Sequence, residues 1–140
     1  MARGGGAKIH MNLSLNTNIL MRYILEDVPD QYEKAAGLIN DISCAYFIPD
    51  MVVSEIVYNL QTRKIPRKDV IDVLYTIFNK KNIMVSEFIL DTVLPFFAKH
   101  PALSFVDCYS AFEAERKGCV PLLTFDRKLA NQHRAVKMVE

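Results

Sequence analysis

The chain has 140 residues, 51% of them hydrophobic and 24% charged, and a formal net charge of +1. This composition is typical of one folded domain and excludes a disordered or fibrous chain. No apolar run reaches the roughly 18–20 residues of a membrane-spanning helix, so we expect no membrane association. The near-zero charge excludes nucleic-acid binding through net charge alone.

The first ten residues, MARGGGAKIH, differ in composition from the rest and have no apolar periodicity. They predict an expression leader or a disordered arm at 1–10, and a single domain at 11–140. Three cysteines without C-x-x-C spacing predict buried thiols in a reducing compartment, and hence a cytoplasmic protein.

Apolar spacing, caps and helix breakers predict the secondary structure in chain order. The expected strands are Asn12–Leu15, Ala45–Ile48, Asn82–Val85, Val120–Thr124 and Val136–Val139. The expected helices are one capped by Thr17 and broken at Pro29, then Asp30–Ser43, Asp50–Gln61, Arg67–Phe78, Glu87–Lys99 with a kink site at Pro95, Ser104–Lys117 and Asp126–Gln132. This alternation predicts an α/β fold: a three-layer α/β/α sandwich around a mostly parallel sheet of about five strands.

Glu55 is the first acidic candidate. Its helix places Met51 and Tyr58 beside it, so we expect a partly buried carboxylate that needs a partner. The alternative is a surface glutamate with apolar neighbours.

Asp107 lies in the apolar segment LSFVDCYSAF, which predicts a strongly buried helix. The alternative is structural, because Ser104-x-x-Asp107 resembles a capping box. Asp126 follows the predicted strand Val120–Thr124, and its alternative role is the cap of the next helix.

Taken together, the three acidic residues stand at strand ends or early in the helices that follow. That placement lets them converge at one edge of a parallel sheet. Clustered carboxylates need a cation, and an all-oxygen site suits Mg²⁺ or Mn²⁺. The histidines at 10, 100 and 133 are scattered, which argues against a zinc site.

The segments LNTNILMRY, VVSEIVYNL, LSFVDCYSAFEA and LLTFDRKL resemble the PIN domain, and more closely the VapC-type toxin of VapBC toxin–antitoxin pairs. The resemblance covers residues 11–140. It implies a parallel sheet between helices and four acidic residues that bind Mg²⁺ or Mn²⁺ and activate water to cut RNA. It also implies a cognate VapB-type antitoxin and a homodimer.

By position, the resemblance assigns the metal-binding and catalytic roles to residue 16, Glu55, Asp107 and Asp126. Thr124 would assist Asp126, and Asn18 would brace the opening turn. The chain departs from the family pattern at Asn16, where the family has aspartate. An amide keeps one coordinating oxygen but loses the charge, so we expect an intact fold and attenuated activity. Deliberate inactivation and a naturally degenerate homologue both explain this residue.

Basic residues flank the predicted site. Arg63 and Arg67 border the turn between two helices, and Arg127 and Lys128 follow Asp126. They could hold RNA phosphates, or they could simply be solvated cations at helix ends. Two further alternatives remain: a catalytically silent PIN-like module that binds RNA or protein, and a DNA nuclease or phosphatase that uses the same acidic residues.

Overall fold

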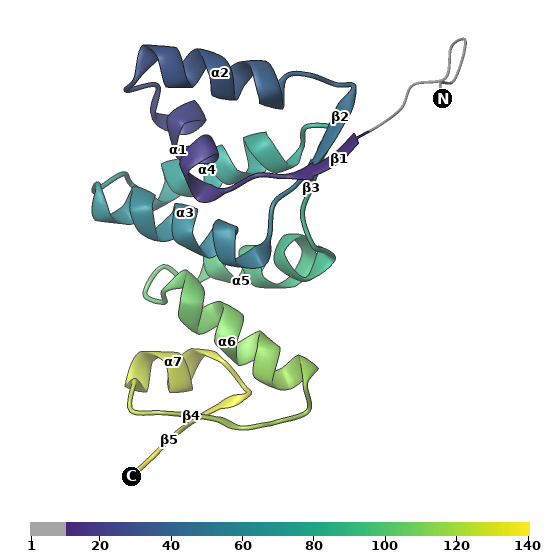
Figure 1. Ribbon diagram of the computed structural model, residues 1–140. Helices are drawn as coiled ribbons and strands as arrows, with labels where there is room; N and C mark the ends of the chain where they lie inside the picture. Colours follow the sequence, from purple (N-terminus) through teal and green to yellow (C-terminus); the bar gives the residue numbers. More distant parts are fainter. Residues whose placement is uncertain (1–10) are drawn as a thin grey trace. The chain divides into compact units, whose positions relative to one another are not determined.

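The computed structural model describes residues 11–140, so the leader expected at 1–10 lies outside the described residues. The described chain divides after Val85 into two compact units. Both are built from helices and parallel strands (Figure 1). The predicted α/β class is therefore confirmed. No helix within this range is long and apolar enough to cross a membrane.

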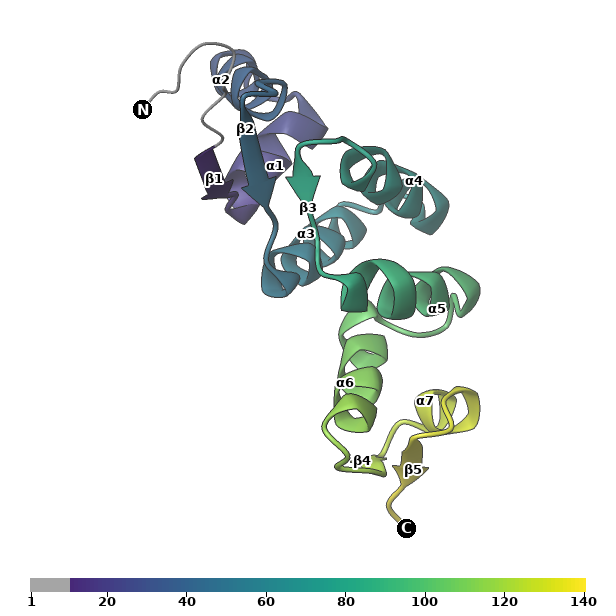
Figure 2. The same cartoon turned by 90° about the vertical axis from the view of Figure 1, so that its right-hand side faces the viewer.

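The first unit contains a three-stranded parallel sheet. Its strands are β1 (Met11–Ser14), β2 (Cys44–Phe47) and β3 (Ile83–Met84), with β2 in the centre (Figure 2). Register places Leu13, Tyr46 and Ile83 side by side on one face. Tyr46 and Ile83 are buried, so this face contributes to the core.

Four helices complete the first unit: α1 (Thr17–Leu25), α2 (Pro29–Ile39), α3 (Asp50–Thr62) and α4 (Arg67–Phe78). Helix α1 contacts both α2 and α3. Figure 1 shows α1 between these two helices. Fully burying one leucine or isoleucine side chain stabilises a fold by about 1.5–3 kcal/mol. The fully buried side chains of these helices include Leu20, Ile39, Ile56, Leu60 and Leu74.

Helix α2 is shorter than predicted, because it ends at Ile39 and not at Ser43. The Asp41 carboxylate accepts hydrogen bonds from both the Ser43 backbone N–H at 3.0 Å and the Ser43 hydroxyl at 2.6 Å. Such local side-chain bonds offer the backbone an alternative to the helix. The turn then leads directly into β2.

The second unit begins with the π-helical turn η1 (Phe88–Val93) and α5 (Leu94–Lys99), followed by α6 (Phe105–Arg116) and α7 (Arg127–Gln132). Strands β4 (Leu122–Thr124) and β5 (Val136–Met138) pair in parallel. Helix α6 contacts η1, α5 and β4, while α7 contacts both strands. The five described strands form one sheet of three and one of two, where the sequence predicted a single sheet of about five.

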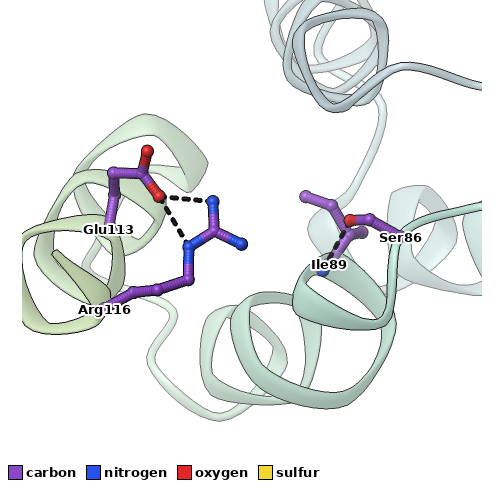
Figure 3. Close-up of polar contacts among 4 residues, drawn as sticks. All are labelled: Ser86, Ile89, Glu113 and Arg116. Atoms are coloured by element: carbon purple, nitrogen blue, oxygen red, sulfur yellow. Dashed lines mark hydrogen bonds and ion pairs between the residues drawn. The ribbon is translucent and has the colours of Figure 1, made fainter.

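The helix predicted at Glu87–Lys99 is divided into η1 and α5. Its start is marked by Ser86, whose hydroxyl accepts a 3.2 Å hydrogen bond from the Ile89 N–H (Figure 3). The Leu94 N–H donates to the Ile89 carbonyl five residues earlier, the spacing of a π turn. Pro95 is the second residue of α5 and cannot donate a backbone hydrogen bond, so the ladder lacks one bond just after η1.

Arg116 fastens the end of α6 to η1. Its guanidinium forms an ion pair with Glu113 on the same helix at 2.6 Å (Figure 3). The same guanidinium lies 3.8 Å from the ring centroid of Phe88, close enough for a cation–π interaction. Gly118 follows with a φ of 71°, a conformation that favours glycine, so the predicted stop of this helix is confirmed.

His133 is buried at the end of α7. Its Nδ1 accepts a 3.0 Å hydrogen bond from the Ala135 N–H. The ring packs edge-on against Phe112 and Phe96, with centroid separations of 4.5 and 5.1 Å. Burial lowers the pKa of His133 below its usual value, because the charged imidazolium would lose its hydration; Glu115 opposes this shift.

Candidate functional site

Asn16 lies just beyond β1 and caps α1. Its backbone is extended, with φ −86° and ψ 163°, and its Oδ1 accepts a 2.7 Å hydrogen bond from the Thr17 N–H. An asparagine in this position satisfies one of the unpaired N–H groups at a helix start. The cap is therefore Asn16, and the prediction that Thr17 caps this helix was wrong.

Thr17 instead joins α1 to α3. Its hydroxyl donates a 2.6 Å hydrogen bond to Oε1 of Glu55. Glu55 is exposed on α3, as are its neighbours Met51 and Tyr58, so the expectation of a partly buried carboxylate was wrong. The hydroxyl bond leaves Oε2 without a partner among residues 11–140.

A row of polar groups continues along α3 at four-residue spacing. The Asn59 Nδ2 donates to the Glu55 carbonyl at 2.8 Å, and an Arg63 guanidinium N–H donates to the Asn59 carbonyl at 3.2 Å. Residues four apart share one face of a helix. This face therefore presents a carboxylate, an amide and a cation in sequence.

These groups line a pocket of about 670 Å³ that belongs wholly to the first unit. Its walls come from α1, α2 and α3. The polar and charged residues lining it are Asn16, Thr17, Asn18, Arg22, Gln31, Lys34, Glu55, Asn59 and Arg63. Asn18, predicted to brace the opening turn, is exposed and lines this pocket.

Asp107 lies in the first turn of α6. Ser104 caps this helix, and its Oγ accepts the Asp107 N–H at 3.1 Å. The Asp107 carboxylate itself has no hydrogen-bond or ionic partner among the residues that the structure describes, so the reciprocal half of a capping box is missing. Its helix is buried on one face only, and Val106 is 54% exposed, which corrects the expectation of strong burial.

Asp126 caps α7. Its Oδ1 accepts the N–H groups of Lys128 at 2.9 Å and Leu129 at 3.2 Å. Its own N–H donates to the Thr124 hydroxyl at 2.9 Å. Asp126 therefore does cap the helix, which was the alternative role predicted for it. Its second carboxylate oxygen, Oδ2, has no partner within residues 11–140.

The basic residues predicted to contact RNA lie at the ends of three different helices. Arg63 is the C-cap of α3 and lines the pocket, so it serves both a helix end and the pocket wall. Arg67 opens α4 and does not line that pocket. Arg127 and Lys128 open α7 and are exposed beside Asp126.

The four predicted metal ligands divide between the two units: Asn16 and Glu55 in the first, Asp107 and Asp126 in the second. Among the described residues, no three His, Cys, Asp or Glu side chains already form a metal cluster. The available donors are all oxygens, and the three carboxylates each keep an oxygen that no described group occupies. That donor chemistry fits Mg²⁺ or Mn²⁺. The ligand set stays a prediction.

Sequence reasoning missed several residues of the pocket. Thr17 was taken for a cap, and Asn59, Lys34, Gln31 and Arg22 were not singled out. The four-residue spacing of Glu55, Asn59 and Arg63 was a readable signal for one shared helix face. No local pattern connects Lys34 on α2 to Glu55 on α3, because their proximity to one pocket depends on tertiary packing.

A family model described as PIN domain matches residues 14–134, a span that includes Asn16, Glu55, Asp107 and Asp126. No curated protein matches the chain. PIN domains are in general nucleases that use divalent metal ions and act on RNA. The chain belongs to the PIN domain family, and with it to the metal-dependent nucleases.

Proposed function

We propose that this protein is a divalent-metal-dependent endoribonuclease of the VapC toxin type, neutralised by a VapB-type antitoxin and attenuated by Asn16. The observation that carries the proposal is the Thr17–Glu55 hydrogen bond of 2.6 Å. It holds a solvent-accessible carboxylate beside Thr17, shortly after the carboxyl end of β1, where open α/β sheets bind their ligands.

Four residues would hold Mg²⁺ or Mn²⁺: position 16, Glu55, Asp107 and Asp126. The free oxygens of the three carboxylates support this assignment. When bound, the ion makes water a better nucleophile and stabilises the charge that develops on the phosphate.

The other side chains orient the ligands and the RNA. Thr17 fixes the position of Glu55, and the Thr124 hydroxyl accepts the Asp126 N–H and so steadies the turn that carries this carboxylate. Arg127 and Lys128, exposed beside Asp126, would contact phosphates of the RNA.

Asn16 weakens this site because it supplies no negative charge. Metal affinity in oxygen sites depends on the number of charged ligands. The domain would therefore fold and bind RNA while cutting it slowly. Deliberate inactivation is the simpler explanation for an asparagine at this position, and natural divergence is the alternative.

The direct experiment restores the acid. Asn16→Asp should raise the rate of cleavage of structured RNA in Mg²⁺ or Mn²⁺ by roughly 100-fold or more, since several kcal/mol of charge stabilisation is at stake. The double variant Asn16→Asp, Glu55→Gln is the matched control and should return to the low rate. Absence of metal-dependent cleavage by Asn16→Asp rules the proposal out.

Two partner assignments accompany the activity. A short antitoxin should bind the restored protein and stop cleavage, and two copies of the chain should form a homodimer. Light scattering of the purified protein with and without the antitoxin, followed by the cleavage assay, checks both. A monomer that no antitoxin inhibits would separate the chain from the toxin class.

A second candidate function is favoured by Asn16 itself: a silent PIN module that binds RNA without cutting it. The pocket with Lys34 and Arg63 on its wall is compatible with such binding. This candidate predicts RNA binding that persists while cleavage stays absent even after Asn16→Asp. The restoration experiment therefore distinguishes the two functions.

A further inference from the structure

The pocket in the first unit is larger than coordination of an ion requires. Its volume of about 670 Å³ falls within the range of pockets that hold small organic ligands, roughly 300–1,000 Å³. Asn16, Thr17 and Glu55 contribute to its lining, and the remaining residues extend along α2 and α3. The pocket therefore continues from the candidate site into a space with its own chemistry.

That space is positively charged. Three cations line it, Arg22, Lys34 and Arg63, against the single carboxylate of Glu55. Arg22 is already paired with Asp27 at 3.2 Å. Lys34 and Arg63 are exposed, and neither forms an ion pair within residues 11–140. Two cations without an ion-pair partner, one on α2 and one at the end of α3, are suited to bind an anionic group such as a phosphate.

The pocket also offers an amide acceptor and an apolar wall. Asn59 uses its Nδ2 to donate to the Glu55 carbonyl, which leaves its Oδ1 as a free acceptor among the described residues. Ile19 and Leu38, the latter 42% exposed, supply apolar surface. Bases of single-stranded RNA are recognised by contacts to the face of the base together with hydrogen bonds to its edge, and here the face would meet aliphatic side chains.

We propose that this pocket binds one nucleotide of the substrate RNA next to the cleaved bond. Lys34 and Arg63 contact its phosphate, Ile19 and Leu38 contact the base, and the Asn59 Oδ1 accepts a hydrogen bond from the base edge. The inference rests on the proposed function only in that the nucleotide belongs to the RNA that is cut. Because the pocket begins at Asn16 and Glu55, an RNA chain crossing that site has a path into it.

The experiment measures RNA binding by the unmodified protein in EDTA, where metal-dependent cleavage cannot occur. The probe is a short fluorescein-labelled single-stranded RNA, followed by fluorescence anisotropy. Each of Lys34→Gln and Arg63→Gln should weaken binding about 5-fold at 0.1 M salt and reduce the salt slope by about 0.7, the effect of one lost phosphate contact.

Lys81→Gln is the matched control, because Lys81 is an exposed lysine of the same unit that does not line the pocket. It should leave the affinity within about 2-fold. Lys34→Arg should retain binding, which separates loss of charge from a folding defect, and circular dichroism should show the same helix content in all variants. Asn59→Ala should narrow the difference in affinity among poly-A, poly-C, poly-G and poly-U probes.

The inference is overturned by no RNA binding by the unmodified protein, by equal loss in Lys81→Gln, or by unchanged affinity in Lys34→Gln and Arg63→Gln. Stronger binding of a glutamate-rich peptide than of RNA, with the same dependence on Lys34, would also overturn it and indicate a protein ligand. Cleavage by Asn16→Asp is scored separately. If Asn16→Asp cuts RNA but Lys34→Gln and Arg63→Gln bind the RNA probe as tightly as the unmodified protein, only the pocket assignment is contradicted. If those two variants bind RNA more weakly but Asn16→Asp does not cut it, only the catalytic assignment is contradicted.

Discussion

The Thr17 hydroxyl and the Glu55 carboxylate are joined by a 2.6 Å hydrogen bond, although 38 residues separate them in the sequence. The bond ties the first residue of α1 to the middle of α3. Because Glu55 is exposed, the bond contributes more to where the carboxylate lies than to the stability of the fold.

This relationship predicts the behaviour of Thr17 variants. In the Asn16→Asp background, Thr17→Val removes the hydroxyl but keeps the shape of the side chain, so RNA cleavage should fall about 10-fold. The free energy of unfolding should change by less than about 1.5 kcal/mol. Thr17→Ser should restore the rate, since it returns the donor. Equal rates for the valine and serine variants would show that the hydroxyl does not position Glu55.

Asn16 should contribute to the stability of the fold, independently of any role in catalysis. Asn16→Ala removes the cap of α1 and should lower the free energy of unfolding by about 1 kcal/mol, measured by urea denaturation. Asn16→Asp should leave it nearly unchanged, because asparagine and aspartate cap helices equally well. A large loss of stability in Asn16→Asp would mean that uncompensated charge near position 16 destabilises the fold without metal.

His133 predicts a pH dependence of stability. Burial lowers the pKa of His133, so between that folded-state value and the unfolded value of about 6.5 the unfolded chain binds the extra proton. Its contribution is complete above pH 6.5 and is lost as the pH falls through the folded-state pKa, with a slope of up to about 1.4 kcal/mol per pH unit. Urea denaturation between pH 7.5 and 5 should show this loss, and His133→Asn should flatten it. An equally steep profile in that variant would assign the effect to other groups.

Lys64 predicts a stabilising substitution. It follows the C-cap of α3 with a φ of 61°, and the Ile65 N–H donates to the Leu60 carbonyl across it, which is the Schellman arrangement. Glycine adopts this conformation without steric cost, so Lys64→Gly should raise the free energy of unfolding by about 0.5–1 kcal/mol. Lys64→Ala removes the charge while keeping the strain and should give no gain. Similar gains in both variants would point to charge as the cause.

The sequence allowed the class of fold and the order of its elements to be predicted, because apolar periodicity and caps are local signals. Ser104 and Gly118 mark the two ends of α6 as predicted. The end of α2 was missed because Asp41 and Ser43 form a competing turn. The division of the strands into two sheets depends on long-range pairing, which no local pattern encodes.

The metal ligands of the candidate site stay a prediction. Glu55, Asp107 and Asp126 could be selected by their place after strands, and the family match spans all three. The environment of Glu55 could not be predicted, because Glu55 and its apolar neighbours Met51 and Tyr58 are all exposed. The pocket formed by α1, α2 and α3 required the packing of three helices that are separate in the sequence.

The cap at Asn16 also fixes which way its amide is turned. Only the oxygen can accept the Thr17 N–H, so the NH₂ group must occupy the place of the second carboxylate oxygen of an aspartate. A cation approaching from that side would meet two protons and no lone pair. Asparagine here is therefore more than an aspartate without its charge, because it reverses the polarity of one position of the site from acceptor to donor.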